Sequence, residues 1–439
     1  MSEITITITD EMAKAVQLIE ETDQHIFITG KAGTGKTTFL RYIVDKLEKR
    51  FVVTASTGIA AINAGGVTLH SLFKIPLGVL SPETPLKGVV YKDTFKLLNS
   101  IDALIIDEIS MVRPDVLDFV DRRLRQVRGI DKPFGGLQLI MFGDLYQLPP
   151  VVKKDEAEVL GAFYEGEYFF YAQTFKKKGF NVVELSHIFR QSDPRFIEIL
   201  NNIRTYQITE EDIEDLSELR DKYMSDQFNS KHIHICTHRR DVERINSKLL
   251  GKSTHKFEAE VKDDFNIGHS PCDNKLALRV GARVMTLINN RTQGYCNGSL
   301  GVVEGIQDDK ITVLLDSGCH AVVEKYTWEC CEYKLNGSKI EKKVKGTCTQ
   351  FPLTLAWAIT IHKSQGLTFD NIIIHTKGTF CPGQIYVALS RCTSLEGIIC
   401  DSFINKRHIM PDKSLLQFEK AYQSTDNYFG AKAANMIKA

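Results

Sequence analysis

Residues 30–37, Gly-Lys-Ala-Gly-Thr-Gly-Lys-Thr, are of the types that bind phosphate groups. They fit the pattern G-x-x-x-x-G-K-[ST], in which glycines expose backbone N–H groups, the lysine reaches the β- and γ-phosphates, and the final hydroxyl can hold Mg²⁺. A glycine loop that only joins a strand to a helix would not need the Lys-Thr pair. The sequence therefore predicts a site for a nucleoside triphosphate and Mg²⁺. Its expected contacts are Gly30, Ala32, Gly33, Thr34, Gly35, Lys36, Thr37 and Thr38.

Two acidic side chains, Asp107 and Glu108, end an apolar run. Mg²⁺ keeps several of its waters, so a single carboxylate is enough for it; we assign Asp107 to the metal and Glu108 to taking a proton from the attacking water. Without the loop upstream, such a pair would be an ordinary polar strand end. Gln147, in GDLYQLPPV (143–151), can hydrogen-bond the γ-phosphate or the water beside it. Taken alone, that segment is better explained as a turn that ends at its prolines.

A parallel sheet would bring these residues together. Apolar runs at 25–29, 51–56, 102–108 and 137–144 are followed by polar residues, which is typical of a doubly wound sheet with ligand groups at the carboxyl ends of its strands. After the glycine loop, apolar residues recur at helical spacing. These are Phe39, Leu40, Ile43, Val44 and Leu47.

The second half of the chain begins with an acidic stretch, 208–227, which we interpret as a solvated helix or a loop beside one. A second α/β unit starts near residue 232, with a strand at 232–236 and a helix at 239–250. Short β stretches follow from 276 to 350, including a hairpin signal at Asn336-Gly337. We predict a small β-barrel inserted into the second α/β unit.

The composition is that of a globular protein with several domains. The chain has 439 residues, 43% of them hydrophobic, and equal numbers of basic and acidic residues, so a polyanion must bind in a local groove. Its 10 cysteines show no C-x-x-C spacing, which disfavours a zinc site and favours free thiols in a reducing cytosol. No leader and no membrane-spanning apolar run is evident, so we expect a cytoplasmic protein.

The ordered motifs resemble those of superfamily 1 helicases, and most closely the petite integration frequency family of 5′-to-3′ DNA helicases. The resemblance extends from about residue 20 to 405. Residues 115–128 followed by 134–140 are similar to that family's own signature. Met12 stands near the place where the family usually has an adenine-reading glutamine. The other motifs are 30–37, 54–73, 107–108, 143–151, 185–191, 353–370 and 383–394.

The resemblance implies an ATP-dependent motor with two RecA-like domains that moves 5′ to 3′ on single-stranded DNA and unwinds duplex. The first domain would span 1–185, with a wedge insertion at about 60–80. The second would span 186–275 and 351–424, interrupted by an SH3-like β-barrel at 276–350. Residues 425–439 would form a loose tail.

The resemblance also assigns roles to individual residues. Arg190 and Arg391 match arginines that stabilise charge on the transferring phosphate, and Gly366, Gly383 and Gln384 match positions near the nucleotide. Isolated arginines and histidines at such positions would more often be structural. The residues that match contacts to single-stranded DNA are Thr57, Gly58, Thr68, His70, Phe73, Thr237, His238, Asn297, Thr360, His362 and Lys363.

Several partners and alternatives follow from the same resemblance. The expected partners are single-stranded DNA and duplex junctions, with G-quadruplexes and RNA–DNA hybrids as further substrates. We expect a monomer when unbound, acting at the nucleoid of a bacterial cytoplasm. Two alternatives stay open: a DNA-stimulated remodelling ATPase that does not unwind processively, and a RecD-like recombination helicase subunit linked to a nuclease.

Overall fold

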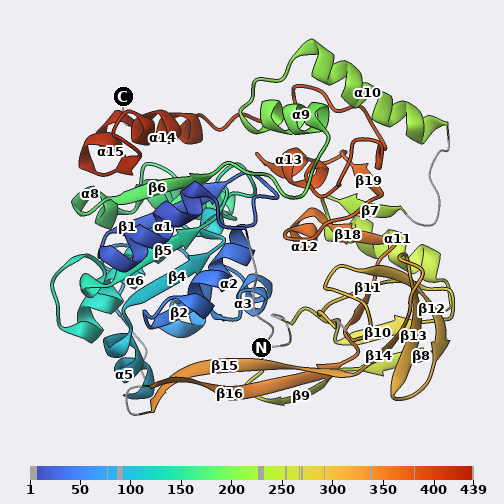
Figure 1. Ribbon diagram of the computed structural model, residues 1–439, viewed down its shortest axis with the longest axis horizontal. Coiled ribbons are helices and arrows are strands. Elements are labelled where there is room, and N and C mark those ends of the chain that lie inside the picture. The colour runs from blue at the N-terminus through green and yellow to red at the C-terminus, as the bar shows by residue number, and fades with distance from the viewer. Residues whose placement is uncertain are drawn as a thin grey trace. The chain divides into compact units, whose positions relative to one another are not determined.

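The computed structural model describes residues 7–76, 78–86, 92–225, 232–252, 255–265, 267, 270–290, 292–336, 339–379 and 381–437. These residues form two compact units (Figure 1). Unit 1 contains Met1–Phe189, Cys331–Val344 and Asp412–Ala439, and unit 2 contains Arg190–Cys330 and Lys345–Pro411. No helix within the described part of the chain is both long and apolar enough to cross a membrane.

Unit 1 is built on a seven-stranded sheet with the order β21-β6-β1-β5-β4-β2-β3. Every neighbouring pair is parallel except β21 and β6 at one edge. All residues of β1, β4 and β5 are buried, which explains why these strands are continuous apolar runs. The strands are β1 (His25–Gly30), β2 (Phe51–Ala55), β3 (Val67–Thr68), β4 (Ala103–Asp107), β5 (Gln138–Phe142), β6 (Phe180–Leu185) and β21 (Tyr428–Phe429).

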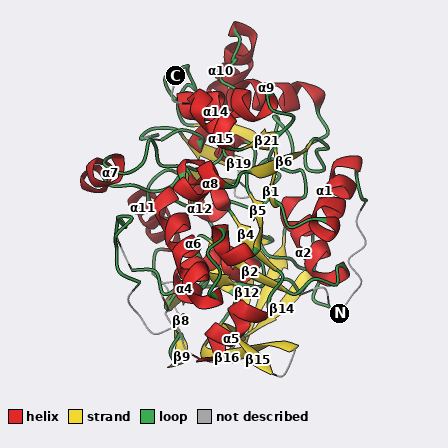
Figure 2. Ribbon diagram, turned by 90° about the vertical axis from the view of Figure 1, so that its left-hand side faces the viewer, coloured by secondary structure: helices red, strands yellow, loops and turns green. Residues whose placement is uncertain are grey.

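Helices cover both faces of this sheet, as Figure 2 shows. On one face, Phe39, Leu40 and Ile43 of α2 are fully buried in a cluster that also contains residues of α1, β1 and β5. Burying each of these side chains contributes about 1.5–3 kcal/mol. On the other face, Phe27 packs edge to face on Phe169, with 5.2 Å between ring centroids. The helices are α1 (Asp10–Glu21), α2 (Lys36–Lys46), α3 (Gly58–Asn63), α4 (Leu69–Phe73), α5 (Lys92–Ser100), α6 (Pro114–Arg128), α7 (Lys154–Gly161), α8 (Gln173–Lys177), α14 (Lys413–Gln423) and α15 (Ala431–Ile437), with 3₁₀ turns η1 (Ile109–Met111), η2 (Pro133–Gly136) and η3 (Phe169–Tyr171).

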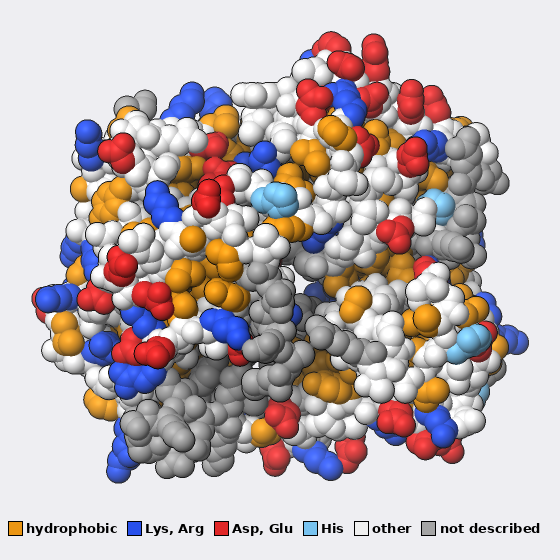
Figure 3. All heavy atoms as spheres, in the orientation of Figure 1, with side chains coloured by type: hydrophobic (Ala, Val, Ile, Leu, Met, Phe, Trp, Pro, Cys, Tyr) orange, Lys and Arg blue, Asp and Glu red, His pale blue; other side chains and the backbone are white. Residues whose placement is uncertain are grey.

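Unit 2 contains a four-stranded parallel sheet with the order β18-β7-β19-β20. The acidic stretch predicted as a solvated helix is α10, and Figure 3 shows Asp and Glu side chains gathered over it. The strands are β7 (Ile233–Cys236), β18 (Ala358–Thr360), β19 (Ile372–His375) and β20 (Ile398–Cys400). The helices are α9 (Pro194–Arg204), α10 (Glu210–Met224), α11 (Arg239–Leu250), α12 (Ile361–Ser364) and α13 (Gln384–Leu389).

Between β7 and β18 the chain forms antiparallel sheets with a separate apolar core. A five-stranded sheet has the order β14-β13-β12-β11-β17, and its inward residues include Val284, Val313 and Val323. The predicted hairpin turn at Gly337 lies outside the described residues. The strands are β8 (His255–Glu258), β9 (Glu260–Asp263), β10 (Lys275–Leu278), β11 (Arg283–Thr286), β12 (Leu300–Ile306), β13 (Lys310–Leu315), β14 (His320–Glu324), β15 (Tyr326–Asn336), β16 (Lys339–Gln350) and β17 (Leu353–Leu355).

The end of the chain differs from the expected loose tail. Asp412–Ala439 group with unit 1, where β21 extends the sheet and α15 packs on α14 and α8. The physical reason is the burial of aromatic side chains: Phe418 and Phe429 are only 1–2% exposed and pack among the phenylalanines of the unit 1 core. The boundary expected at residue 424 therefore lies at 411/412 in the structure.

Candidate nucleotide and nucleic-acid sites

The glycine loop connects β1 directly to α2, as the motif predicts. Gly30 has φ +153°, and a Cβ there would lie 2.7 Å from the carbonyl oxygen of Leu185 and 2.8 Å from Oγ1 of Thr34. Gly35 caps α2 in the left-handed region, with φ +79°. Side chains at either position would be strained, so the sequence requirement for glycine here is steric. The start of α2 lies at this loop, and the first N–H groups of a helix favour an anion.

Lys36 folds back over the start of the loop. Its Nζ donates to the carbonyl oxygens of Gly30 at 2.7 Å and Lys31 at 2.9 Å. Thr34 Oγ1 donates to the Lys31 carbonyl at 3.0 Å and is fully buried. The ammonium charge is thus held at the loop, within reach of any phosphate that the loop binds. Thr37 is half-buried, whereas Thr38 is exposed.

Asp107 and Glu108 lie where β4 ends. The Asp107 side chain is 7% exposed, and its Oδ1 accepts from the backbone N–H of Glu108 at 2.9 Å. Burial raises the pKa of Asp107 to about 6, and the positive charges of Lys36 and Arg41 oppose that rise. A carboxylate buried at the end of a strand suits a cation ligand. Glu108 has φ +51°, a costly conformation for a residue other than glycine and one that is common at functional sites.

Gln147 lies in the loop after β5, which we call the sensor loop (residues 143–150). Its Nε2 donates to Asp144 Oδ2 at 3.1 Å, and the side chain is 7% exposed. Asp144 is almost completely buried. The structure therefore holds the Gln147 amide in a fixed position at the carboxyl end of β5.

Phe189 was not predicted from the sequence and lies beside the glycine loop. Its backbone N–H donates to the carbonyl oxygen of Gly33 at 2.9 Å. Its ring carbons lie 3.6–3.7 Å from where a Cβ on Gly35 would be. The ring is 50% exposed and packs edge-on against His187, with centroids 4.3 Å apart. An exposed aromatic ring at a phosphate loop offers a stacking surface for a nucleobase. Its position before Arg190 in HIFRQ was the available signal.

The two predicted arginines both lie in unit 2 and contact the same segment. Arg190 Nη1 donates to the carbonyl oxygen of Ser390 at 3.0 Å, and burial lowers the pKa of Arg190. Arg391 is 2% exposed; its Nε donates to the Val387 carbonyl at 2.9 Å and its Nη2 to Ser390 Oγ at 2.8 Å. Gln384, near the start of α13, is also buried, and Gly366 has φ +77°.

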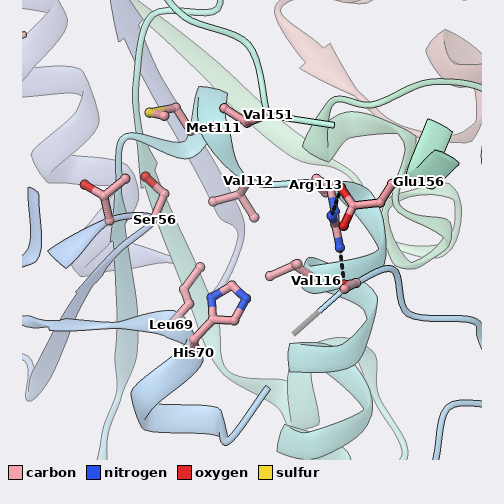
Figure 4. A pocket seen from close by; sticks show the side chains of 11 residues that line it. Ser56, Leu69, His70, Met111, Val112, Arg113, Val116, Val151 and Glu156 are labelled. Atoms are coloured by element: carbon pink, nitrogen blue, oxygen red, sulfur yellow. Dashed lines mark hydrogen bonds and ion pairs between the residues drawn. The ribbon is translucent and has the colours of Figure 1, made fainter. Parts of the chain in front are cut away.

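Two of the predicted DNA contacts of unit 1, Thr57 and His70, line one pocket of about 310 Å³ (Figure 4). Thr57 caps α3 and Thr68 caps α4, each through its Oγ1, so both helices begin at a hydroxyl. Gly58 opens α3. The lining residues are Ser56, Thr57, Leu69, His70, Gly78, Met111, Val112, Arg113, Val116, Val151 and Glu156.

Helix α6, which carries the predicted family signature, holds one wall of this pocket. Arg113 Nη2 donates to the Gly78 carbonyl at 2.6 Å and to Asp115 Oδ2 at 2.8 Å. Asp115 in turn accepts from the backbone N–H of Leu80 at 2.9 Å. Val151, which follows the sensor loop, is 69% exposed at the rim. The family resemblance indicated Thr57, but nothing local in the sequence indicated Val151 or Arg113.

The structure contradicts the predicted DNA contact of Phe73. Phe73 is among the residues that match the family's contacts to single-stranded DNA, but its side chain is 0% exposed and belongs to the core of unit 1. An aromatic ring completes the apolar face of α4, and this face packs inward because burial is the stronger preference for phenylalanine.

In unit 2, the predicted contacts gather at the carboxyl ends of two neighbouring strands. Thr360 ends β18 and pairs with Cys236 of β7, so Thr237 and His238 follow at the same edge. Thr360 caps α12, and His362 and Lys363 on that helix are exposed. Asn297 is separate: it lies in a loop before β12, where its N–H donates to Asn289 Oδ1 at 2.8 Å.

The chain is similar to known proteins in sequence and in structure. Residues 7–214 match the family described as PIF1-like helicase. The ATP-dependent DNA helicase PIF1 of Danio rerio is 35% identical over 90% of this chain and 61% of the relative, so the chain spans about three fifths of that relative's length.

Solved structures of Bacteroides Pif1 are also similar. In complex with ADP-AlF4, that protein is 54% identical, with a TM-score of 0.92 over 97% of this chain and 99% of the other. Bound to ssDNA, it is 55% identical, with a TM-score of 0.74 over 97% and 99%. These similarities agree with the glycine loop, its lysine and the paired acidic residues at a strand end. The chain belongs to the PIF1-like helicase family.

Proposed function

We propose that this chain is an ATP-dependent DNA helicase that moves 5′ to 3′ along single-stranded DNA and unwinds duplex ahead of it. The observation that carries the proposal is that the glycine loop with Lys36 follows β1 and that buried Asp107 ends β4, two parallel strands of one sheet, where the positive charge of Lys36 acts on the Asp107 carboxyl. Direction of travel and duplex separation rest on family membership. The named helicase relative and the Bacteroides Pif1 complexes with ADP-AlF4 and ssDNA support the substrate classes.

For hydrolysis, the loop N–H groups and Lys36 would bind the phosphates. Thr37 and Asp107 would hold Mg²⁺, which supplies positive charge against the β- and γ-phosphates. Glu108 would accept a proton from the attacking water, and Gln147 would orient that water or contact the γ-phosphate. The adenine would stack on Phe189, a role that matters more here because Met12 cannot read the base by hydrogen bonds as a glutamine can.

For the transition state, we assign charge stabilisation to Arg190 and Arg391, with Gly366 and Gln384 near the nucleotide. Guanidinium groups suit this role because they present several donors to phosphate oxygens. In the described conformation both arginines donate to oxygens of unit 2 itself. Their proposed role therefore requires at least part of these hydrogen bonds to be exchanged for phosphate oxygens during the cycle.

For strand tracking, hydroxyl, amide and imidazole groups would contact the DNA backbone and bases. Few of these groups are charged, which suits binding that ignores base sequence. The pocket beside Thr57 and His70 is large enough to receive one unstacked base. The proposed contacts are Thr57, Gly58, Thr68 and His70 in unit 1, and Thr237, His238, Asn297, Thr360, His362 and Lys363 in unit 2.

The finer assignments are also proposals. Units 1 and 2 would supply the two motor domains, with a wedge at about residues 60–80 and the antiparallel insertion acting as an SH3-like barrel. Substrates would include G-quadruplexes and RNA–DNA hybrids as well as duplex junctions. The unbound protein would be a monomer acting at the nucleoid of a bacterial cytoplasm.

The decisive experiment is strand separation on duplexes that carry either a 5′ or a 3′ single-stranded overhang. We expect unwinding of the 5′-tailed substrate only, dependent on ATP and Mg²⁺. Strand-stimulated hydrolysis without separation of either substrate would instead favour a remodelling ATPase. Unwinding of the 3′-tailed substrate alone would overturn the proposed direction.

A further inference from the structure

The last 26 described residues, 412–437, form an element of unit 1 that we call the C-terminal segment. It comprises α14, β21 and α15, which lie beside β6 and α8 in Figures 1 and 2. Phe418 stacks on Phe170 with 4.2 Å between centroids. The backbone N–H of Val182 donates to the Asn427 carbonyl at 2.7 Å. The segment is thus firmly packed on the unit that carries the glycine loop.

Two tyrosines of unit 1 donate their hydroxyls to carboxylates of this segment. Tyr168, at the start of η3, donates to Asp412 Oδ2 at 2.7 Å. Tyr146 donates to Glu419 Oε2 on α14. The two hydrogen bonds are of one chemical type, but only Tyr146 belongs to the sensor loop.

Tyr146 and Gln147 share a single buried carboxylate. The backbone N–H of Tyr146 donates to Asp144 Oδ1 at 3.2 Å, and Gln147 Nε2 donates to Asp144 Oδ2 at 3.1 Å. The backbone N–H of Gln147 also donates to the Asp144 carbonyl at 3.0 Å. A shift of Tyr146 would therefore move the carboxylate that holds the Gln147 amide.

We propose that Glu419 is a positioning residue for ATP hydrolysis: through Tyr146 it fixes the sensor loop and, with it, Gln147. This inference rests on the proposed function, in which Gln147 contacts the γ-phosphate or the attacking water. Groups that position a reacting water must be held within a fraction of an ångström, and a displacement of about 1 Å can cost about 100-fold in rate. The C-terminal segment thereby contributes to hydrolysis without touching the nucleotide.

The test compares Glu419→Ala and Tyr146→Phe with Tyr168→Phe in the full chain. We expect the first two to lower the kcat of DNA-stimulated ATP hydrolysis roughly tenfold, with KM for ATP within about twofold, because a misplaced Gln147 affects the reacting water more than binding. Tyr168→Phe removes the matched hydrogen bond to the same segment. Tyr168→Phe should lower Tm about as much as Tyr146→Phe does and leave kcat unchanged.

Two further variants separate positioning from loss of folding. Glu419→Gln keeps an oxygen that can accept from Tyr146, and it should restore most of kcat. The double variant Tyr146→Phe with Glu419→Ala should be no slower than either single variant, because both remove one interaction.

The failures are distinguishable. An equal fall in kcat for Tyr168→Phe would mean that the segment acts through stability alone and would overturn the inference. Unchanged kcat in folded Glu419→Ala would overturn it as well, while leaving the proposed function intact. A wild-type chain without DNA-stimulated hydrolysis would overturn the proposed function and this inference together.

Discussion

The backbone N–H of Phe189 donates to the carbonyl oxygen of Gly33 at 2.9 Å, which fixes an exposed aromatic ring beside the phosphate loop. Phe189 follows β6 in the chain and is thereby attached to the glycine loop that follows β1. Strands β1 and β6 are hydrogen-bonded neighbours in the sheet. A ring held this way loses little entropy when a base stacks on it, because its backbone is already ordered.

Phe189→Ala should weaken ATP binding without affecting the recognition of phosphates. Base stacking on an aromatic ring contributes about 1–3 kcal/mol, so we expect the Kd for ATP to rise roughly tenfold. Inorganic tripolyphosphate has no base, and its Kd should stay within about twofold. Fluorescence competition titrations measure both constants. Phe189→Tyr is the matched control and should bind ATP normally; equal losses for ATP and tripolyphosphate would show that the variant damages the loop instead.

Glu108→Gln should separate nucleotide binding from hydrolysis. Glutamine has the same shape but cannot accept the proton from water, so turnover should fall by roughly 100- to 10,000-fold. The Kd for ATP should stay near the wild-type value because the loop and Lys36 are intact. Phosphate release and equilibrium binding check the two parts. Near-normal turnover in Glu108→Gln would show that Glu108 is not the base. By contrast, Lys36→Ala should lose phosphate binding as well as hydrolysis.

The parts of the fold that follow local rules could be predicted from the sequence. The prediction of parallel sheets flanked by helices is confirmed, because β1, β4 and β5 are buried on both faces and must be continuous apolar runs. The glycine loop was predictable because its backbone conformation excludes side chains at Gly30 and Gly35.

The missed parts depend on partners far away in the sequence. The pattern of the C-terminal segment shows that Phe418 is apolar, but not that it stacks on Phe170, which lies 248 positions earlier. Phe73 was misassigned because a match to a family motif does not show whether an aromatic ring faces DNA or the core. The sequence also gave no indication of the hydrogen bond that attaches Phe189 to the loop.

His70→Ala should weaken the binding of single-stranded DNA. Its ring lines the pocket, and removing one aromatic or imidazole contact to a base costs about 1–3 kcal/mol, so we expect a rise in Kd of roughly tenfold for a thymidine oligonucleotide. Fluorescence anisotropy at fixed salt measures this. Buried Phe73, on the same helix, provides the contrast: Phe73→Leu should lower Tm and leave DNA affinity unchanged. The contact is wrong if His70→Ala binds DNA as tightly as the wild type.

His25, the first residue of β1, makes the stability of unit 1 sensitive to acid. Its side chain is 0% exposed, and Nδ1 accepts from the backbone N–H of Leu139 at 3.1 Å, so this nitrogen must be unprotonated. Phe134 packs edge-on against the imidazole at 5.1 Å. Burial lowers the pKa of His25 to about 3, and repulsion from Lys178 adds to this effect.

The sign of the resulting pH dependence follows from proton uptake on unfolding. Between the folded pKa of about 3 and the unfolded value of about 6.5, the unfolded chain binds more protons at this site, so stability falls as the pH is lowered. From pH 7 to pH 5 the contribution of His25 to the loss is about 2 kcal/mol. His25→Asn keeps an acceptor near the Leu139 N–H but does not titrate. The free energy of unfolding in urea should therefore fall from pH 7 to pH 5 by about 2 kcal/mol more for the wild type than for His25→Asn. Equal falls for the two proteins would show that His25 does not unfold with the transition observed.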